Sequence, residues 1–393
     1  MEYPRYVKTV IDNLTSHGYE AYIVGGCLRD MLIGRAPSDF DVTTSALPEE
    51  ILRVFSDMRT IPTGLKHGTV TVLSEGNAIE VTTFRTDGEY LDSRHPESVS
   101  FTSNICDDLS RRDFTVNAIA YNETRGIVDP FCGKEDITRK LLRAVGNPET
   151  RMKEDALRIM RALRFSAQLG FSIEKNTLAA LETTKEGLAD ISRERIGVEL
   201  AKLITATEPE NAIRIMIETK ISAYIFGDYI PNKKILSVLN ELPTDFFIRF
   251  SALLWNCDRE NARKILSSLK YSNAQKNGIL TILCTRENPL PQSDAETRRF
   301  IIRLGEHAER AATLLCALGG ATENFWEEFN KVKSSEFARK ISDLALNGND
   351  LTDLGFSGKQ IGQVLSSLLE KVIDDPTLNN KEKLIDIINN KDF

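Results

Sequence analysis

The feature that most constrains the fold of this chain is a change of pattern at Pro148. Before it, short β-rich runs alternate with helical runs. After it, apolar residues recur at helical spacing and strand signals nearly vanish. The fold class we predict is α+β, a small mixed α/β head followed by an all-helical neck, body and tail. The predicted boundaries are residues 1–148 for the head, 149–205 for the neck, 206–333 for the body and 334–393 for the tail.

The periodicity also predicts individual elements in each part. In the head we expect helices at Tyr6–Leu14, Cys27–Leu32 and Pro48–Phe55, and strands at Glu20–Val24, Phe40–Thr43, Thr69–Leu73 and Ala78–Arg85. Beyond the head we expect helices at Arg151–Leu169, Lys175–Thr184, Glu194–Thr205, Glu208–Thr219, Lys233–Leu242, Asp245–Trp255 and Arg259–Leu269.

Composition indicates a globular protein with local basic clusters. The net charge of −7 argues only mildly against a nucleic-acid partner, because Lys and Arg gather within residues 111–112, 139–143 and 151–164. The six cysteines are scattered without a CxxC pair, which favours reduced thiols in a cytoplasmic protein. No apolar run has the length of a membrane span, and the N-terminus lacks the apolar core of a signal peptide.

Two aspartates at a spacing of two are the first candidate site. On a strand, Asp39 and Asp41 would share one face and repel each other unless a cation lay between them. Mg²⁺ is the cofactor that suits a few carboxylates combined with substrate phosphate oxygens, and paired ions can drive phosphoryl displacement. The alternative is a solvated turn. Glu80, on a later strand, is either a third catalytic acid or a partner for a nearby arginine.

A glycine pair after the first strand is the second candidate site. Gly25 and Gly26 precede a predicted helix, so a backbone there can approach phosphate closely. Arg29 would add a forked cation for triphosphate oxygens. The alternative is an ordinary strand–turn–helix joint with Arg29 and Asp30 on the surface.

Six motifs in order resemble one known family. GGCLRD, SDFDV, PTGLKHGTVTV, RRDFTVNAIAYN, DPFCG and EDALRIMRALRF are similar to those of the class II tRNA nucleotidyltransferases, the CCA-adding enzymes, which belong with bacterial poly(A) polymerases in the polymerase-β-like superfamily. The match is dense over about residues 21–203. It continues loosely through NGNDLTDLGFSGKQIGQVLSSLLEKV near the end.

The resemblance implies a role for each matching residue. Asp39 and Asp41 would hold the metals, and Gly26 and Arg29 would contact the phosphate or sugar of the nucleotide. The other implied nucleotide-binding residues are Arg112, with Asp155 and Arg158 as readers of the base, and Arg161 and Arg164 on the same helix.

Asp155 and Arg158 have the chemistry to select C and A without a template. At a spacing of three on a helix they would share a face. Cytosine and adenine both offer an amino donor beside a ring-nitrogen acceptor, which a carboxylate and a guanidinium complement. Guanine and uracil present the reverse, and unpaired buried groups would penalise them. The alternative is a surface ion pair of little energetic value.

Two further segments bear on the resemblance. In the family, a flexible loop at residues 85–96 is needed to add the final A, and this chain keeps its full length, although His95 stands where we expect an arginine and Ala156 where proline is common. In the tail, Gly358 to Gly362 opens a helix and is either a phosphate contact or a plain cap. No His-Asp pair of a phosphohydrolase domain occurs.

We therefore expect a nucleotidyltransferase that adds CCA to the 3′ end of tRNA from CTP and ATP and releases pyrophosphate. Within enzymes, the alternatives are an A-adding enzyme and a poly(A) polymerase. From another class, the alternative is a catalytically silent RNA-binding protein, against which the retention of both Asp39 and Asp41 argues.

Overall fold

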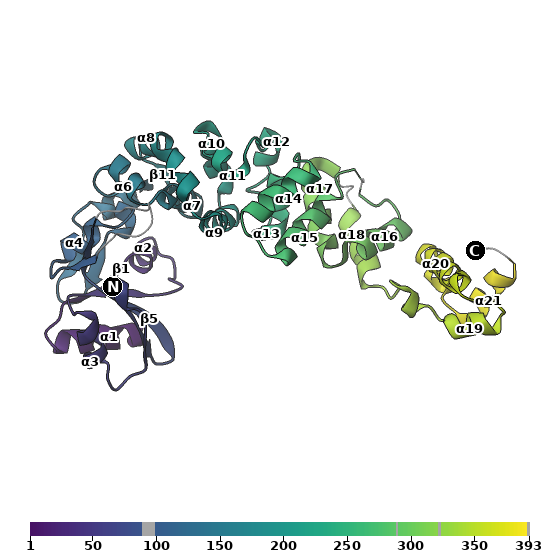
Figure 1. Ribbon diagram of the computed structural model, residues 1–393, viewed down its shortest axis with the longest axis horizontal. Helices are drawn as coiled ribbons and strands as arrows, with labels where there is room; N and C mark the ends of the chain where they lie inside the picture. Colours follow the sequence, from purple (N-terminus) through teal and green to yellow (C-terminus); the bar gives the residue numbers. More distant parts are fainter. Residues whose placement is uncertain (89–98, 288–289, 321–323, 391–393) are drawn as a thin grey trace. The chain divides into compact units, whose positions relative to one another are not determined.

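The computed structural model describes residues 1–88, 99–287, 290–320 and 324–390 (Figure 1). It divides into two compact units, Met1–Ile230 with Ile265–Tyr271, and Pro231–Lys264 with Ser272–Phe393. The α+β class is confirmed, because the sheet lies in the first unit and the rest is mostly helical. The predicted four-part division is not tested by this partition and stays a prediction.

The first unit contains every strand of the described structure. The strands are β1 (Ala21–Val24), β2 (Asp41–Thr44), β3 (Thr60–Gly64), β4 (Thr69–Ser74), β5 (Asn77–Thr83), β6 (Arg85–Asp87), β7 (Val99–Phe101), β8 (Ala120–Asn122), β9 (Gly126–Val128), β10 (Leu141–Leu142) and β11 (Ser172–Ile173). Its helices are α1 (Arg5–Ser16), α2 (Gly26–Leu32), α3 (Pro48–Val54), α4 (Ile105–Ser110), α5 (Gly133–Thr138), α6 (Pro148–Glu154), α7 (Leu157–Leu169), α8 (Lys175–Thr184), α9 (Arg193–Ile204), α10 (Pro209–Glu218) and α11 (Ser222–Phe226).

A seven-stranded sheet in the order β3-β4-β5-β2-β1-β8-β9 forms the head. β2 and β5 run parallel, while β1 is antiparallel to both β2 and β8. The register places Asp41 opposite Val24 on β1 and opposite Glu80 on β5. The head elements predicted from the sequence are therefore present, with their ends shifted by a few residues.

Both faces of β1, an inner strand of the sheet, are buried, which explains why it is apolar throughout. Ala21 and Ile23 belong to a core shared with α1 and α3, whereas Tyr22 and Val24 belong to a second core with α4. Neighbouring residues of a strand point to opposite faces, so each core takes every second side chain. The carboxyl end of β1 is thereby held rigidly where Gly25 begins.

The long helix predicted at Arg151–Leu169 is wrong, because the structure breaks it into α6 and α7. Asp155 has the extended backbone angles φ −142° and ψ 103°, and its carboxylate accepts a hydrogen bond from the amide of Leu157. Asp155 therefore ends one helix and caps the next. Apolar periodicity continues across the break, since both helices bury one side, and this is why the pattern concealed it.

All the regular secondary structure described in the second unit is helical. It contains α12 (Lys233–Leu236), α13 (Phe246–Leu253), α15 (Asn273–Leu283), α16 (Asp294–Leu304), α17 (Ala308–Leu315), α18 (Phe325–Ser334), α19 (Gly348–Asp353), α20 (Lys359–Asp374) and α21 (Lys381–Asn389). α14 (Arg259–Ser268) begins in this unit and ends in the first. The predicted helix Lys233–Leu242 is too long, because only its first four residues are α-helical.

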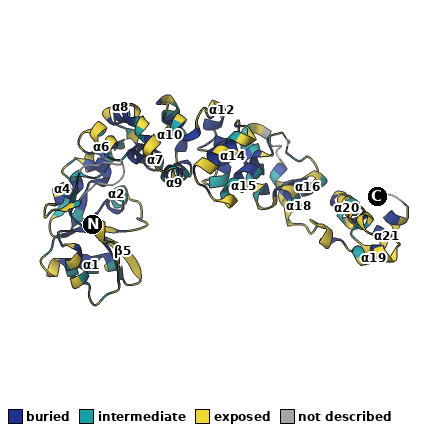
Figure 2. Cartoon of the chain, viewed as in Figure 1, coloured by how far each residue is buried: buried dark blue, intermediate teal, exposed yellow. Residues whose placement is uncertain are grey.

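The C-terminal segment has a small core of its own. Leu351, Leu368 and Leu384 are fully buried on α19, α20 and α21, and α20 alternates buried and exposed sides (Figure 2). α20 is also joined to α16, since Arg298 donates to the carbonyl oxygens of Ile373 and Asp374. No described helix is long and apolar enough to cross a membrane.

Candidate active site

A cavity of about 530 Å³ in the first unit gathers most of the residues singled out in the sequence. The predicted residues that line it are Gly26, Arg29, Asp39, Asp41, Arg112, Asp155, Arg158 and Arg161. Arg164 instead lines an adjoining cavity. Glu80 does not line either of the two cavities, but its register places it beside Asp41.

The turn between β1 and α2 requires glycine at its first position. Gly25 has φ +80°, in a region that side chains rarely adopt, and a Cβ there would lie 3.2 Å from Nη1 of Arg112. It would also lie 3.9 Å from Oδ2 of Asp41. The missing side chain thus lets the turn, a cation and a carboxylate meet at one end of the cavity.

The carboxylates form a repulsive group. Asp39 precedes β2, as it precedes the predicted strand Phe40–Thr43, and both aspartates line the cavity. Burial, together with the negative charges of Asp39 and Glu80, raises the pKa of Asp41 to about 6, against the opposing effect of Arg112. A divalent cation would relieve this repulsion.

The donor set suits a hard cation that also binds substrate. Carboxylate oxygens are the ligands that Mg²⁺ prefers. Among residues 1–88, 99–287, 290–320 and 324–390, no three His, Cys, Asp or Glu side chains are arranged to hold a metal ion. An ion at Asp39 and Asp41 would therefore take its other ligands from phosphate oxygens and water.

Several arginines also line the cavity, and hydrogen bonds hold most of them in place. Arg29 is buried and donates to Asp30 at 2.7 Å and to Asn117 at 2.7 Å, so the surface alternative is wrong for this residue. Arg112 donates to the buried Asp108 at 3.1 Å. Its Nε is buried without a hydrogen-bond partner among the described residues.

An aromatic ring aligns three of these cations. Phe165 lies 5.2 Å from the guanidinium carbons of Arg29 and Arg161 and 3.9 Å from that of Arg164. Arg161 is further held by Asp113, at 2.8 and 2.5 Å. Burial alone would raise the pKa of Asp113, but Arg161 and Asn117 lower it below its usual range, so the pair is ionised.

Asp155 and Arg158 do not form the ion pair of the alternative interpretation, and they do not share one helix as expected. Asp155 lies in the break between α6 and α7, and its Oδ2 accepts from Nη2 of Arg195 at 2.8 Å. Arg158 instead pairs with Glu154 and donates to the carbonyl oxygen of Arg151. Both Asp155 and Arg158 nevertheless line the cavity, so each remains available to a base.

Sequence reasoning gave no role to several residues of this cavity, among them Arg195, Asn117 and Phe165. Arg195 comes from α9, and its Nη1 is buried without a hydrogen-bond partner in the described part of the chain. Asn117 and Phe165 lie inside quoted motifs but received no role. For Arg195 no signal was available in the sequence, because its 40-residue separation from Asp155 closes only on folding.

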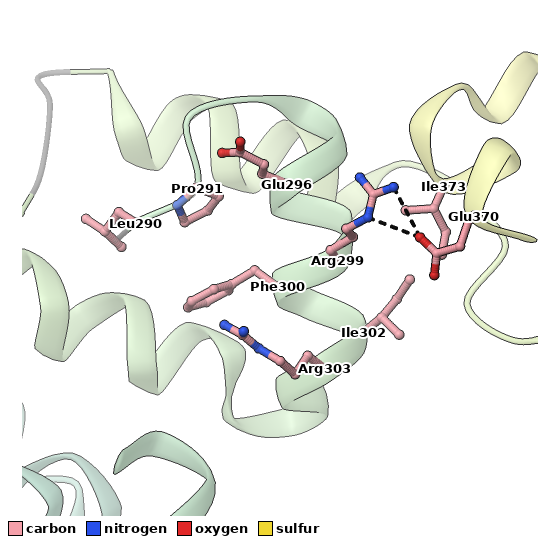
Figure 3. Close-up of a pocket in the computed structure, with 9 residues that line it drawn as sticks. All are labelled: Leu290, Pro291, Glu296, Arg299, Phe300, Ile302, Arg303, Glu370 and Ile373. Atoms are coloured by element: carbon pink, nitrogen blue, oxygen red, sulfur yellow. Dashed lines mark hydrogen bonds and ion pairs between the residues drawn. The ribbon is translucent and has the colours of Figure 1, made fainter. Parts of the chain in front are cut away.

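A cavity of about 540 Å³ in the second unit lacks this chemistry (Figure 3). Figure 3 shows Arg299 reaching Glu370, while Phe300 and Arg303 lie away from that pair. Arg299 also pairs with Asp374 at 2.7 Å. Two acids line this cavity: Glu370 is paired with Arg299, and Glu296 accepts a hydrogen bond from the backbone amide of Gln292 at 2.7 Å.

Comparisons with known proteins match nearly the whole chain. Family models match three stretches of the chain: "Poly A polymerase head domain" over residues 21–143, "Probable RNA and SrmB-binding site of polymerase A" over 170–231, and a tRNA nucleotidyltransferase domain 2 over 248–388. The CCA-adding enzyme of Geobacillus kaustophilus is 38% identical over 384 residues, 95% of this chain and 94% of that protein. The chain belongs to the CCA-adding enzyme family. The CCA-adding enzyme of Streptococcus pneumoniae is 39% identical over 385 residues, 95% of this chain and 94% of that protein.

Solved structures of CCA-adding enzymes have the same fold. The Bacillus stearothermophilus enzyme in complex with CTP matches with a TM-score of 0.85 and 33% identity, covering 100% of this chain and 99% of that one. The Thermotoga maritima CCA-adding enzyme complexed with tRNA matches with a TM-score of 0.72 and 21% identity, covering 98% and 94%. At that lower identity the likeness concerns the fold alone. The predicted family is confirmed.

Proposed function

We propose that this chain adds CCA to the 3′ end of tRNA from CTP and ATP and releases pyrophosphate. One observation carries the proposal: the carboxylates of Asp39 and Asp41, the Gly25–Gly26 turn and several arginines line one cavity. Its relatives over nearly the whole chain are CCA-adding enzymes, and one related structure holds CTP. With tRNA as the substrate, we expect the enzyme to act in the cytoplasm.

In the proposed reaction the chain holds the nucleotide and the ions. Asp39 and Asp41 would hold Mg²⁺, which when bound neutralises charge on the reacting phosphate. Gly26 and Arg29 would contact phosphate oxygens beside them, and Arg112, which also lines the cavity, would contact the nucleotide. For Glu80 we propose an electrostatic role, since its charge contributes to the raised pKa of Asp41 without its side chain lining the cavity.

For the choice of base we propose that three residues act together: Asp155 and Arg158 contact the base, and Arg195 holds Asp155 in place. Asp155 is held by Arg195 and by the amide of Leu157, and each of its oxygens keeps a free lone pair. It can accept from the amino group of cytosine or adenine while Arg158 donates to the ring nitrogen. Arg161 and Arg164, aligned on Phe165, would hold the rest of the nucleotide.

The loop at residues 85–96, on which addition of the final A depends by family resemblance, falls largely outside the described residues, and His95 lies among residues 89–98. β6 and β7 flank that segment.

For the tail, we propose the phosphate-contact alternative at Gly358–Gly362, because α20 begins at Lys359 with Gly358 at its N-terminus. The four-part division of the chain likewise stands as our proposal.

One assay separates the candidate functions. Purified protein is incubated with Mg²⁺, CTP and ATP and with tRNAs that lack all three terminal nucleotides, lack only the final A, or are complete. Extension of both truncated tRNAs to CCA is the expected result. Extension only of the tRNA ending in CC would indicate an A-adding enzyme, and long tails on any RNA would indicate a poly(A) polymerase. If no RNA is extended, the remaining candidate is a catalytically silent RNA-binding protein.

A further inference from the structure

A second cavity, of about 560 Å³, adjoins the nucleotide cavity. The two are neighbours because Gly26, Arg29, Asp39 and Phe165 line both. Loop residues around Arg35 and the end of α9 enclose its other side. A ligand that passes Asp39 from the first cavity therefore enters the second.

The second cavity carries an excess of positive charge. Its lining includes four cations, Arg29, Arg35, Arg164 and Lys202, and two carboxylates, Asp30 and Asp39. Asp30 is occupied by Arg29, and Arg164 is occupied by Glu199 at 2.5 Å. The cavity therefore favours an anion.

Arg35 and Lys202 are the cations without an acidic partner. Nη1 of Arg35 donates to the carbonyl oxygen of Gln168 at 2.9 Å, which anchors the side chain without neutralising it. Within the described residues, neither Arg35 nor Lys202 forms an ion pair with a carboxylate. Both side chains are exposed, so a ligand reaches them without rearrangement.

The order of residues along the two cavities gives the direction of the nucleotide. Asp155, Arg158 and Arg195 line only the first cavity, whereas Asp39 lines both. A nucleotide with its base at Asp155 and its α-phosphate at Asp39 points its outer phosphates toward Arg35 and Lys202. In-line displacement puts the attacking oxygen on the side of the α-phosphorus opposite the leaving group.

We propose that the second cavity holds the outer phosphates and the departing pyrophosphate, with Arg35 and Lys202 as its binding residues. The inference rests on the proposed function. The 3′-oxygen of the RNA bonds to the α-phosphorus, the bond from that phosphorus to the bridging oxygen breaks, and pyrophosphate leaves with the electron pair. The hydroxyl proton passes to water. Arg35 and Lys202 donate to the pyrophosphate oxygens and disperse the charge that develops there.

The test measures pyrophosphate directly in the full-length protein. Arg35→Ala, Lys202→Ala and the double variant are compared with wild type in two assays: pyrophosphorolysis of complete tRNA, and inhibition of CTP addition by added pyrophosphate. Each single variant should raise the KM and the Ki for pyrophosphate by about five- to tenfold, the loss of one charge-assisted hydrogen bond in a solvated site. The double variant should raise both further, while the KM for tRNA stays within about twofold.

Matched variants control for folding and for general charge. Lys175→Ala removes an exposed cation of the same unit outside both cavities and should leave all constants unchanged. Arg35→Lys and Lys202→Arg keep the charge and should restore most of the pyrophosphate affinity. Unfolding temperatures of the variants should match wild type, since both side chains are exposed.

Two outcomes would overturn the inference. A raised KM for tRNA with unchanged pyrophosphate constants would mean that the cavity holds the phosphodiesters of the acceptor RNA. No change in any constant would mean that it holds neither. Both outcomes leave the proposed function intact, whereas a wild-type protein that adds no nucleotide refutes the function itself.

Discussion

At the scale of single residues, the neighbouring carboxylates of the site repel one another. Asp41 is crowded by Asp39 and Glu80, and its pKa is raised to about 6. A carboxyl whose pKa is higher in the folded than in the unfolded state destabilises the fold when ionised. The penalty is absent below the unfolded value near 3.8 and fully present above about 6. The Asp41 carboxylate is surrounded by protein on most sides but still meets solvent through the cavity, so solvent screening keeps this penalty small.

We therefore predict that Asp41→Asn stabilises the metal-free protein while abolishing nucleotide addition. Its unfolding temperature should exceed that of wild type by ~1–2 °C at pH 8 and equal it near pH 4, since a neutral amide mimics the protonated acid. Adding Mg²⁺ with CTP should raise the unfolding temperature of wild type and leave that of the variant unchanged. Asp57→Asn, an exposed acid elsewhere in the head, is the control. Robust addition by Asp41→Asn would overturn the metal assignment.

A second residue-scale prediction concerns Arg195, which positions Asp155. Arg195→Ala removes a charge-assisted hydrogen bond of 2.8 Å, so the carboxylate loses its orientation. Discrimination of CTP and ATP against UTP and GTP should fall by about tenfold, with Arg195→Lys intermediate. The measurement is the ratio of kcat/KM values for single additions to a truncated tRNA. Unchanged ratios in Arg195→Ala would contradict the positioning role, whatever happens to stability.

At the scale of elements, one break between helices and one close contact determine how the helices of the first unit are arranged. α6 and α7 are separated at Asp155, which turns a carboxylate out of the helical pattern and into the cavity. α9 packs so closely on residues 265–271 that Gly197 has no room for a side chain. A Cβ there would lie 2.5 Å from the carbonyl oxygen of Leu269, and Tyr271 donates to the carbonyl of Gly197 at 2.8 Å.

Gly197→Ala should consequently destabilise the first unit by ~1–3 kcal/mol, because the clash is with backbone and must push α9 away from its neighbour. Gly362→Ala is the control, since it lies in α20 with no atom within 4 Å of a Cβ. It should be neutral or stabilising by up to about 1 kcal/mol, as helical glycine is costly. Urea denaturation provides both values. Equal effects of the two substitutions would contradict this account of the contact.

At the scale of the whole molecule, the two compact units are interleaved along the chain. Residues 265–271 belong to the first unit although residues on both sides of them belong to the second. The connection between units is therefore made more than once, and no single cut separates them. The net charge of −7 also gives a poor indication of affinity for nucleic acid, because arginine and lysine side chains are concentrated around the two cavities.

Affinity for tRNA should accordingly fall steeply with salt despite the negative net charge. Between 50 and 200 mM salt we expect at least a tenfold loss, as phosphate contacts release counterions. Lys359→Ala, at the start of α20, should lower the slope of log Kd against log salt by about one if the tail contacts a phosphate. Lys371→Ala, near the other end of α20, is the matched control. A slope unaltered by Lys359→Ala would return Gly358–Gly362 to a plain helix cap.

The sequence by itself determined the α+β class, the family and most of the residues that line the 530 Å³ cavity of the first unit. Local pattern suffices for these: Gly25 and Gly26 follow a strand, Asp39 and Asp41 are neighbours in the chain, and Arg158 and Arg161 are one turn apart. The residues of each such group are close in space because they are close in the chain.

Only the tertiary structure decided which partners these residues have. Asp155 pairs with Arg195 and Arg29 with Asn117, across 40 and 88 residues, and Arg35 comes beside Gln168 across 133. The break at Asp155 was equally hidden, since amphipathic periodicity runs through it. The physical reason is the same in each case. Hydrophobic pattern records which side of an element is buried, whereas ion-pair choice depends on distances that exist only after the elements pack.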